Sequence, residues 1–364
     1  MSETLGRKVL RAAYRGVIGT AALAALPFRT RNELAVFYGG ARPGDFGGTL
    51  VKVRLLQGRF PERRVGFSLV YMLSNAIYLP QFAVDAVRAA GVPVVLNQNG
   101  VFYRGWFPHG WERENARMAR VHAAADHVFY QSEFCRRSAE RFLGSRIGSS
   151  EILYNGVDTD IFVPHAGPRP DRPFTFVTTG KFDTAMGYRL TSAIDGLAAA
   201  RRGGLDVQLD IAGIMSLDVA AAAHAQIGRL GLSEAVRIKG PYTGTQAPAI
   251  YQAADAYLMT KHNDPCPNAV LEALACGLPV LYSASGGVPE QVGDRAGIGL
   301  PVPETFEEDV TPDPDAMAEG MARVIQGRAG MAQSARERAV ARFDLKDWLN
   351  RHDAVFHSQL KKTS

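Results

Sequence analysis

The sequence has few cysteines, and they are not arranged as in a disulfide scaffold or a metal site. Among 364 residues there are three, Cys135, Cys266 and Cys276, and no two of them form a C-x-x-C pair. An odd number of separated thiols excludes a disulfide-stapled fold and indicates a reducing, cytosolic compartment. Histidines with metal-ligand spacing do not accompany them, and no Asp-x-Asp pattern has supporting ligands, so we predict no metal site.

Long apolar runs are also missing from the body of the chain. No stretch of eighteen apolar residues follows the N-terminal segment, which excludes a membrane-spanning body. The chain is 46% hydrophobic and 21% charged, close to ordinary soluble proteins, and this composition excludes disorder. Its length suits about two domains.

A basic surplus is absent outside the N-terminus. Residues 1–31 hold six basic side chains against Glu3, which accounts for the whole formal net charge of +5. The other residues hold 35 basic and 35 acidic side chains. A nucleic-acid-binding protein would more often spread basic residues over its folded domain, so we expect no nucleic-acid partner.

Residues 1–32 are predicted to form a basic amphipathic helix. Arg7, Arg11 and Arg15 follow one another by about 40° on a helical wheel, with apolar residues on the opposite arc and Pro27 as the stop. Three interpretations remain open: a surface helix packed on the body, an interfacial helix on an anionic membrane, and a cleaved signal peptide.

The body alternates short apolar runs with helical stretches. Runs such as 92–97, 174–179 and 280–282 are typical of buried strands, which predicts parallel sheets covered by helices on both faces. The proline-rich segment 165–173 reads as a linker. The predicted domains are residues 33–165 and 166–345, two Rossmann-like domains facing each other across a cleft. Residues 346–364 are expected to form a helix that packs back on the first domain.

The most informative stretch runs from Lys261 to Gly293. Asp264 lies in a loop just before a predicted helix, and Glu272 lies in the early turns of that helix. A helix N-terminus suits an anionic ligand such as a diphosphate. Glu272 would repel phosphate and is better suited to accept hydrogen bonds from ribose hydroxyls, the alternative being a partner of its own helix dipole. A second glycine turn at 285–287 lets backbone approach a ligand closely.

At this point the sequence resembles a known family. Asp264, seven intervening residues and Glu272, followed by Ala-Leu-Ala-Cys-Gly-Leu-Pro-Val, are similar to the signature of the retaining family 4 glycosyltransferases. Segments 39–48 and 154–162 agree with it, and the resemblance spans roughly residues 34–345. It implies an α/β protein of the GT-B fold that uses a UDP-, GDP- or ADP-sugar and needs neither metal nor cofactor. The family usually has Glu where Asp264 stands.

The resemblance implies how the donor is bound. Asp264 would contact the donor sugar, Glu272 would hold the ribose, and the backbone around Asn268 and Ala269 would bind sugar and phosphate. His262 is a candidate to fill the gap left by the shorter Asp264. The candidate donor residues in all are Glu272, Lys181, Asn268, Ala269, Gly47, Gly48, Gly240, Tyr242, Arg189 and His262.

The phosphate and nucleobase contacts are implied in the same way. Lys181 matches one of two family cations, whereas Met186 stands where the second lysine is expected, and Arg189 is a candidate substitute. The glycines at 47–48 would let a loop approach the phosphates. The turn at 240–242 would read the base. A plain turn is the alternative for both glycine segments.

The acceptor side departs from the family, which often has His-Gly after an N-domain strand. Here Asn99 precedes Gly100, and an amide positions substrate but cannot act as a base. His109 is the nearest alternative, with a surface role as its competing interpretation. The aromatic residues between Phe102 and Trp111 form either core or an acceptor platform.

We therefore expect a retaining, metal-independent hexosyltransferase that moves a sugar to a saccharide or lipid-linked acceptor, in cell-surface polysaccharide synthesis. The catalytic candidates are Asp264, Asn99 and His109. The protein would be cytoplasmic or peripheral on the inner face of the cell membrane, through residues 1–31. The alternatives are a catalytically weak nucleotide-sugar-binding protein, for which Asp264, Met186 and Asn99 speak, and a GT-B nucleotide-sugar epimerase.

Overall fold

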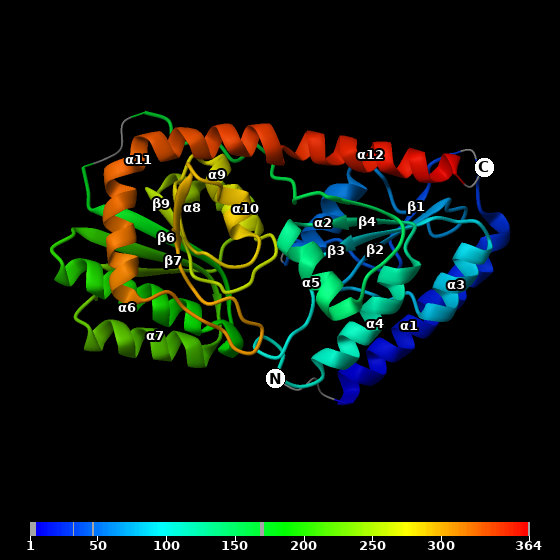
Figure 1. Cartoon of the computed structure of the whole chain (residues 1–364), viewed down its shortest axis with the longest axis horizontal. Coiled ribbons are helices and arrows are strands. Elements are labelled where there is room, and N and C mark those ends of the chain that lie inside the picture. The colour runs from blue at the N-terminus through cyan, green and yellow to red at the C-terminus, as the bar shows by residue number, and fades with distance from the viewer. Residues whose placement is uncertain (1–4, 32, 46, 168–170, 363–364) are drawn as a thin grey trace. The chain divides into compact units, whose positions relative to one another are not determined.

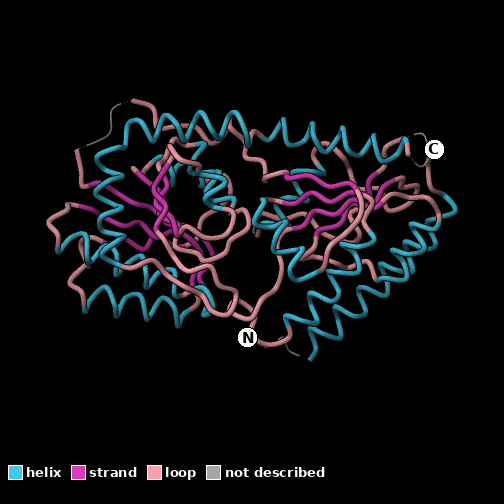
Figure 2. Tube along the Cα trace, in the orientation of Figure 1, coloured by secondary structure: helices cyan, strands magenta, loops and turns pink. Residues whose placement is uncertain are grey.

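The computed structural model describes residues 5–31, 33–45, 47–167 and 171–362, and the chain divides into two compact units (Figure 1). Unit 1 comprises residues 1–102, 109–154 and 348–364, and unit 2 comprises residues 103–108 and 155–347. Unit 2 thus begins before the expected linker, and it takes in a short segment from the first half of the chain. Each unit is built on its own parallel sheet (Figure 2).

Unit 1 contains a five-stranded sheet in the sequential order β1-β2-β3-β4-β5, with every neighbouring pair parallel. The strands are β1 (Val36–Phe37), β2 (Leu69–Leu73), β3 (Val94–Gln98), β4 (His127–Tyr130) and β5 (Ser149–Ile152). The helices are α1 (Leu5–Ala25), α2 (Gly48–Gln57), α3 (Gln81–Ala89), α4 (Trp111–Ala124), α5 (Glu133–Leu143) and most of α12 (Leu345–Lys361), with a 3-10 turn, η1, at Leu26–Phe28. Every residue of β2, β3 and β4 is buried, which explains their unbroken apolar pattern in the sequence.

Unit 2 contains a six-stranded parallel sheet in the order β11-β10-β9-β6-β7-β8. The strands are β6 (Phe174–Phe182), β7 (Val207–Met215), β8 (Val236–Gly240), β9 (Ala256–Met259), β10 (Val280–Ser283) and β11 (Gly297–Leu300). The helices are η2 (Thr184–Met186), α6 (Tyr188–Arg202), α7 (Leu217–Arg229), α8 (Ala247–Gln252), α9 (Asn268–Ala275), α10 (Val288–Val292) and α11 (Pro314–Phe343). Read from β8, the order is 3-2-1-4-5-6, which is the Rossmann order.

The core of unit 2 lies under one face of this sheet. Apolar side chains from α6, α7 and the first half of α11 pack on β6, β7 and β10, including Leu190, Ile194, Val219, Met317 and Met321. Helices α8, α9 and α10 lie on the other face (Figure 1). Two helix-covered faces are what the alternating apolar runs predicted.

Helix α1 packs on unit 1, but with an unexpected face. The Tyr14 hydroxyl donates to the Gly40 carbonyl at 2.8 Å, and Ile18, Ala22 and Ala25 are buried. Arg15 lies on this same side of the helix, where burial and then Arg117 lower its pKa. The apolar arc with Val9, Leu10 and Val17 is instead exposed, at 61%, 72% and 63%. The second half of the helix determines which side packs. Its buried apolar residues lie on the same side of the helical wheel as Arg11 and Arg15.

By length and composition alone, residues 9–28 could also cross a membrane, and 17% of that window is buried. Signal sequences and buried core helices have the same length and composition, so this observation carries little weight by itself.

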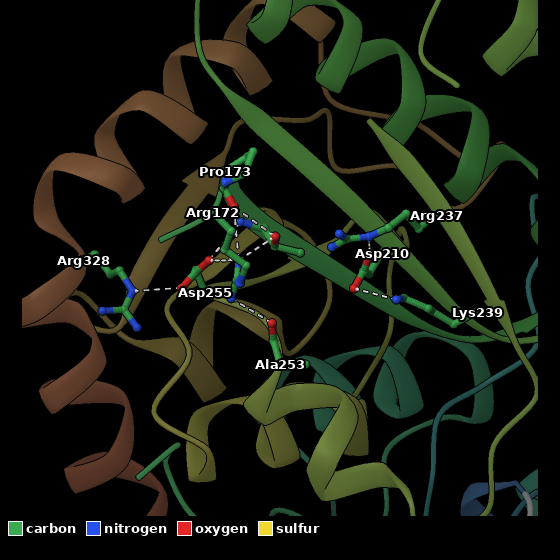
Figure 3. A network of polar contacts seen from close by, with 9 residues as sticks. Arg172, Pro173, Asp210, Arg237, Lys239, Ala253, Asp255 and Arg328 are labelled. Atoms are coloured by element: carbon green, nitrogen blue, oxygen red, sulfur yellow. Dashed lines mark hydrogen bonds and ion pairs between the residues drawn. The ribbon is translucent and has the colours of Figure 1, made fainter. Parts of the chain in front are cut away.

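A polar network anchors the start of the sheet in unit 2 (Figure 3). One carboxylate oxygen of Asp255 accepts from the Arg172 guanidinium at 2.6 Å and from the Thr175 N–H at 2.9 Å, and Arg328 lies 3.8 Å from the other. Asp210 pairs with Arg237 and Lys239 nearby. Asp255 and Thr175 stand at the amino ends of β9 and β6, so this network fixes the edge opposite the strands' carboxyl ends.

The aromatic segment between residues 102 and 111 is divided between the units. Tyr103 is buried in unit 2, with its ring 5.2 Å from that of Phe306. Trp111 packs edge-on against Phe142 in unit 1, and Trp106 is 37% exposed. Tyr103 and Trp111 therefore pack against other rings, as the core interpretation expects.

Candidate functional site

The strand order of unit 2 reverses between β6 and β9, and ligands of such sheets bind beyond the carboxyl ends of the strands at this point. The segments that leave these ends are the start of α6, the loop before α9 and the turn at 284–287. The predicted donor residues Lys181, Arg189, His262, Asp264 and Glu272 therefore come from segments that meet at one edge of one sheet.

The loop before α9 holds Asp264 tightly. Its Oδ2 lies 2.7 Å from the Lys261 ammonium, and its Oδ1 accepts the Cys266 N–H at 3.2 Å. The Gly287 N–H donates to the Asp264 carbonyl at 2.9 Å, and a Cβ on Gly286, whose φ is +66°, would come within 2.3 Å of that carbonyl. The glycine turn at 285–287 therefore packs its backbone directly against the loop that carries Asp264, which only glycine at position 286 permits.

Asn155 fixes the other end of this loop. Its side-chain amide donates to the Cys266 carbonyl at 3.0 Å and to the Asn268 Oδ1 at 2.7 Å. Asn268 is the first residue of α9, and Ala269 is half-buried beside it. Asn155 was noted in the sequence only as part of a family-like segment, because its contact spans more than a hundred residues.

Glu272 is a half-buried carboxylate within α9. Its Oε2 accepts from the Tyr251 hydroxyl at 2.6 Å, and burial raises its pKa. No basic side chain among the described residues pairs with it. The first turn of α9 contains no acidic residue, so Glu272 is not the dipole partner that the alternative interpretation required.

Tyr251, which donates to this carboxylate, belongs to a network of tyrosine hydroxyls. Tyr251 and Tyr257 each lie 3.2 Å from the Thr179 hydroxyl at the end of β6. Burial, and secondarily the Glu272 charge, raise the pKa of Tyr242 to about 12, while hydrogen bonds with Thr179 and Tyr251 oppose that rise. The turn at 240–242, predicted to read the base, is thus brought beside the carboxylate predicted to hold the ribose.

The two candidate phosphate cations differ sharply. Lys181 ends β6 with its side chain 73% exposed and 3.6 Å from Asp183. Arg189, in the first turn of α6, is 6% exposed, and its guanidinium lies 4.9 Å over the Phe182 ring. Its Nη2 donates to the Thr179 carbonyl at 3.2 Å, and its Nε has no partner. Within the described chain no carboxylate neutralises Arg189.

His262 is fully buried beside a carboxylate that the sequence did not single out. Its Nδ1 lies 4.0 Å from Asp309 Oδ1, and burial lowers its pKa, so the ring is neutral at pH 7. Burial raises the pKa of Asp309 to about 6, with Lys261 opposing. Asp309 lies in an acidic loop, 304–309, which reads in the sequence as ordinary solvated charge.

The acceptor candidates lie in unit 1. Asn99 follows β3, and its Oδ1 accepts from the Lys52 ammonium at 3.2 Å and from Gln131. Its Nδ2 donates to Asn75 at 2.6 Å. His109 is exposed, and it makes no hydrogen bond to this network within the described part of the chain. Lys52, which is buried on α2, was not predicted from the sequence as a site residue. A lysine among the apolar residues of a predicted helix was the feature that could have indicated it.

The glycine loop of unit 1 is open. Gly47 has a φ of +87° and caps α2, and a Cβ on Gly47 or Gly48 would meet no atom within 4 Å. Over the described residues no group of three or more His, Cys, Asp and Glu side chains could hold a metal ion.

Known proteins resemble this chain in sequence and in fold. Residues 166–342 match the family model described as "Glycosyl transferases group 1". The chain is similar to the D-inositol 3-phosphate glycosyltransferases of Salinispora arenicola, 28% identical over 224 residues, and of Mycobacteroides abscessus, 30% identical over 193 residues. Each match covers 52% of this chain, and 45% and 42% of those relatives, so the chain spans less than half of their length.

Two solved structures resemble the chain over most of its length. Anabaena HepE in complex with UDP has a TM-score of 0.65 at 20% identity, covering 80% of this chain and 79% of its own. Sucrose-phosphate synthase from Thermosynechococcus elongatus has a TM-score of 0.65 at 18% identity, covering 86% and 77%. The chain therefore has the GT-B fold, and its residues 166–342 carry the sequence pattern of the group 1 glycosyl transferases.

Proposed function

We propose that this protein is a retaining glycosyltransferase that takes a sugar from a UDP-, GDP- or ADP-sugar and transfers it to a saccharide or lipid-linked acceptor. One observation carries the proposal: the Glu272 carboxylate and the buried Arg189 guanidinium, neither with an ion-pair partner among the described residues, share one hydrogen-bond network at the sheet edge where Rossmann folds bind nucleotides. Glu272 suits ribose hydroxyls, and Arg189 suits a diphosphate.

The reaction then needs little covalent help from the chain. The acceptor oxygen bonds to the anomeric carbon on the face from which the nucleoside diphosphate leaves, so the configuration is retained. The acceptor proton passes to an oxygen of the leaving phosphate. Arg189, Lys181 and the amino end of α9 stabilise the charge that develops on that phosphate, without a metal or other cofactor. Asn99 and, on the same side, His109 are proposed to position the acceptor.

A catalytically weak nucleotide-sugar-binding protein is the second candidate. The observation that favours it is that both oxygens of Asp264 are occupied within its own loop, by Lys261 and by the Cys266 N–H. Asp replaces the family's Glu at this position, and the shorter side chain reaches less far.

A nucleotide-sugar screen separates these functions. We expect one family of UDP-, GDP- or ADP-sugars to raise the melting temperature of the full chain and to be hydrolysed slowly without acceptor, because Glu272 and Arg189 in unit 2 would bind its ribose and diphosphate. Thermal-shift and product measurements on the same panel check this. A sugar nucleotide that binds and is never cleaved would favour the binding protein, and no binding at all would contradict both candidates.

We further propose that the protein works in the cytoplasm, on the inner face of the cell membrane, in cell-surface glycan synthesis. The exposed apolar face of α1 and the basic residues of the N-terminal segment support this, because such faces enter the headgroup region of anionic bilayers.

Replacing Val9, Leu10 and Val17 by serine is expected to weaken binding to phosphatidylglycerol-containing vesicles at least about tenfold, since three inserted side chains are lost. Cosedimentation measures this. The matched control is Leu217→Ser, which removes a side chain 91% exposed on α7 in unit 2 and is expected to change nothing. Unaltered vesicle binding by the triple variant would leave α1 as a packing element only.

A further inference from the structure

The loop between β11 and α11 contributes a carboxylate to the same edge of unit 2. Asn263 donates from its side chain to the Thr305 carbonyl at 2.7 Å, and the Gly105 N–H donates to the Phe306 carbonyl at 2.9 Å. The Phe306 ring is buried against Tyr103. These contacts fix the loop against the segment that carries Asp264, so Asp309 is held in place.

The charges at this position do not balance within the protein. Asp264 and Asp309 are two carboxylates near one cation, and Lys261 is 2.7 Å from Asp264. His262 is neutral because burial lowers its pKa. Asp309 accepts no hydrogen bond from any described residue, yet its side chain is only 20% exposed. A carboxylate withdrawn from water in this way is destabilising unless a ligand donates to it.

A second observation also indicates a ligand. The His262 side chain is fully buried, and its Nδ1 lies 4.0 Å from Asp309 Oδ1. Neither ring nitrogen is satisfied by a side chain of the described residues, and the Pro303 backbone only partly opposes the lowering of the His262 pKa by burial. The Tyr103 hydroxyl lies near the same carboxylate, whose charge raises the Tyr103 pKa beyond the larger effect of burial. His262 and Tyr103, from two different segments, thus lie near Asp309 without donating a hydrogen bond to it.

We propose that Asp309 determines donor specificity by accepting a hydrogen bond from a hydroxyl of the donor sugar. This inference rests on the proposed function. A neutral, hydroxyl-rich group fits the position, because a carboxylate repels phosphate and Lys261, the cation beside it in the described chain, is engaged by Asp264. Asp309 thereby makes the contact to the donor sugar that Asp264 cannot make, because the Asp264 side chain is shorter than Glu and both of its oxygens are already bonded. His262 and Tyr103 line the position around Asp309.

Loss of the Asp309 charge should weaken binding of the sugar and leave binding of the nucleotide unchanged. Asp309→Asn keeps the shape of the side chain and removes its charge, so the fold is retained. We expect the Kd of the glucose conjugate to rise at least about tenfold, as for loss of a charged hydrogen bond, while the Kd of the nucleoside diphosphate stays unchanged. The discrimination between glucose, galactose and N-acetylglucosamine conjugates should shrink as well.

Calorimetric titration of the full chain with UDP, GDP, ADP and their sugar conjugates measures these constants. Glu308→Gln is the matched control, because that neighbouring carboxylate is exposed, and it should leave every Kd unchanged. Wild-type sugar affinity and selectivity in Asp309→Asn, or an equal loss for nucleotide and sugar conjugate, would overturn the inference while the proposed function stands. Wild-type protein that binds none of the nucleotides would overturn both.

Discussion

Glu272→Ala is expected to weaken binding of the nucleoside diphosphate roughly 30- to 150-fold, which corresponds to about 2–3 kcal/mol for hydrogen bonds to a charged group. The carboxylate has one oxygen engaged by Tyr251 and the other without a partner among the described residues, so it is ready to accept from a ribose. Titration of the full chain with ribo and 2′-deoxy forms of the nucleotide measures the effect.

The sugar of the nucleotide provides the control for this prediction. Wild-type protein should prefer the ribo form, and Glu272→Ala should bind both forms equally, because the group that distinguishes them is gone. Tyr251→Phe removes only the hydrogen bond to Oε2 and should retain the preference. A Glu272→Ala protein that still prefers ribose would show that another group holds the ribose.

Arg189→Met is expected to lower the affinity for the nucleoside diphosphate about 100-fold and, at the same time, to stabilise the ligand-free protein by about 1–3 kcal/mol. Both effects follow from one cause. The guanidinium is 6% exposed with no carboxylate partner in the described residues, so it costs free energy until an anion binds. Chemical denaturation and titration of the same preparation measure the two changes.

Lys181→Met is the matched comparison for Arg189→Met. Lys181 is 73% exposed on its side chain, so its charge is solvated and screened in the free protein. We expect a smaller loss of affinity, no more than about tenfold, and no gain in stability. If Arg189→Met destabilised the free protein and bound the diphosphate normally, Arg189 would be a structural residue and the family's second cation would be missing here.

Much of the fold could be predicted because its strands are buried on both faces. The runs 174–179 and 280–282 lie within β6 and β10, and the proline-rich segment lies immediately before β6. No apolar run marks β11, whose sequence is Gly-Ile-Gly-Leu, or β5, whose residues are exposed or half-buried. The C-terminal helix expected at 346–364 corresponds to α12, which Asp344 separates from α11.

The residue patterns by themselves predicted two α/β domains and placed Asp264 before a helix and Glu272 within it, and the resemblance of the 264–293 stretch to a family implied the GT-B fold. Periodicity and helix-end residues are local, so they can be read from neighbouring letters. The tertiary structure alone decided which charges are neutralised. Lys261 forms an ion pair with Asp264, whereas Arg189 and Asp309 have no oppositely charged partner in hydrogen-bond contact among the described residues, and the apolar arc of α1 is exposed. Charge balance and burial depend on segments brought together from distant positions, and no local pattern specifies them.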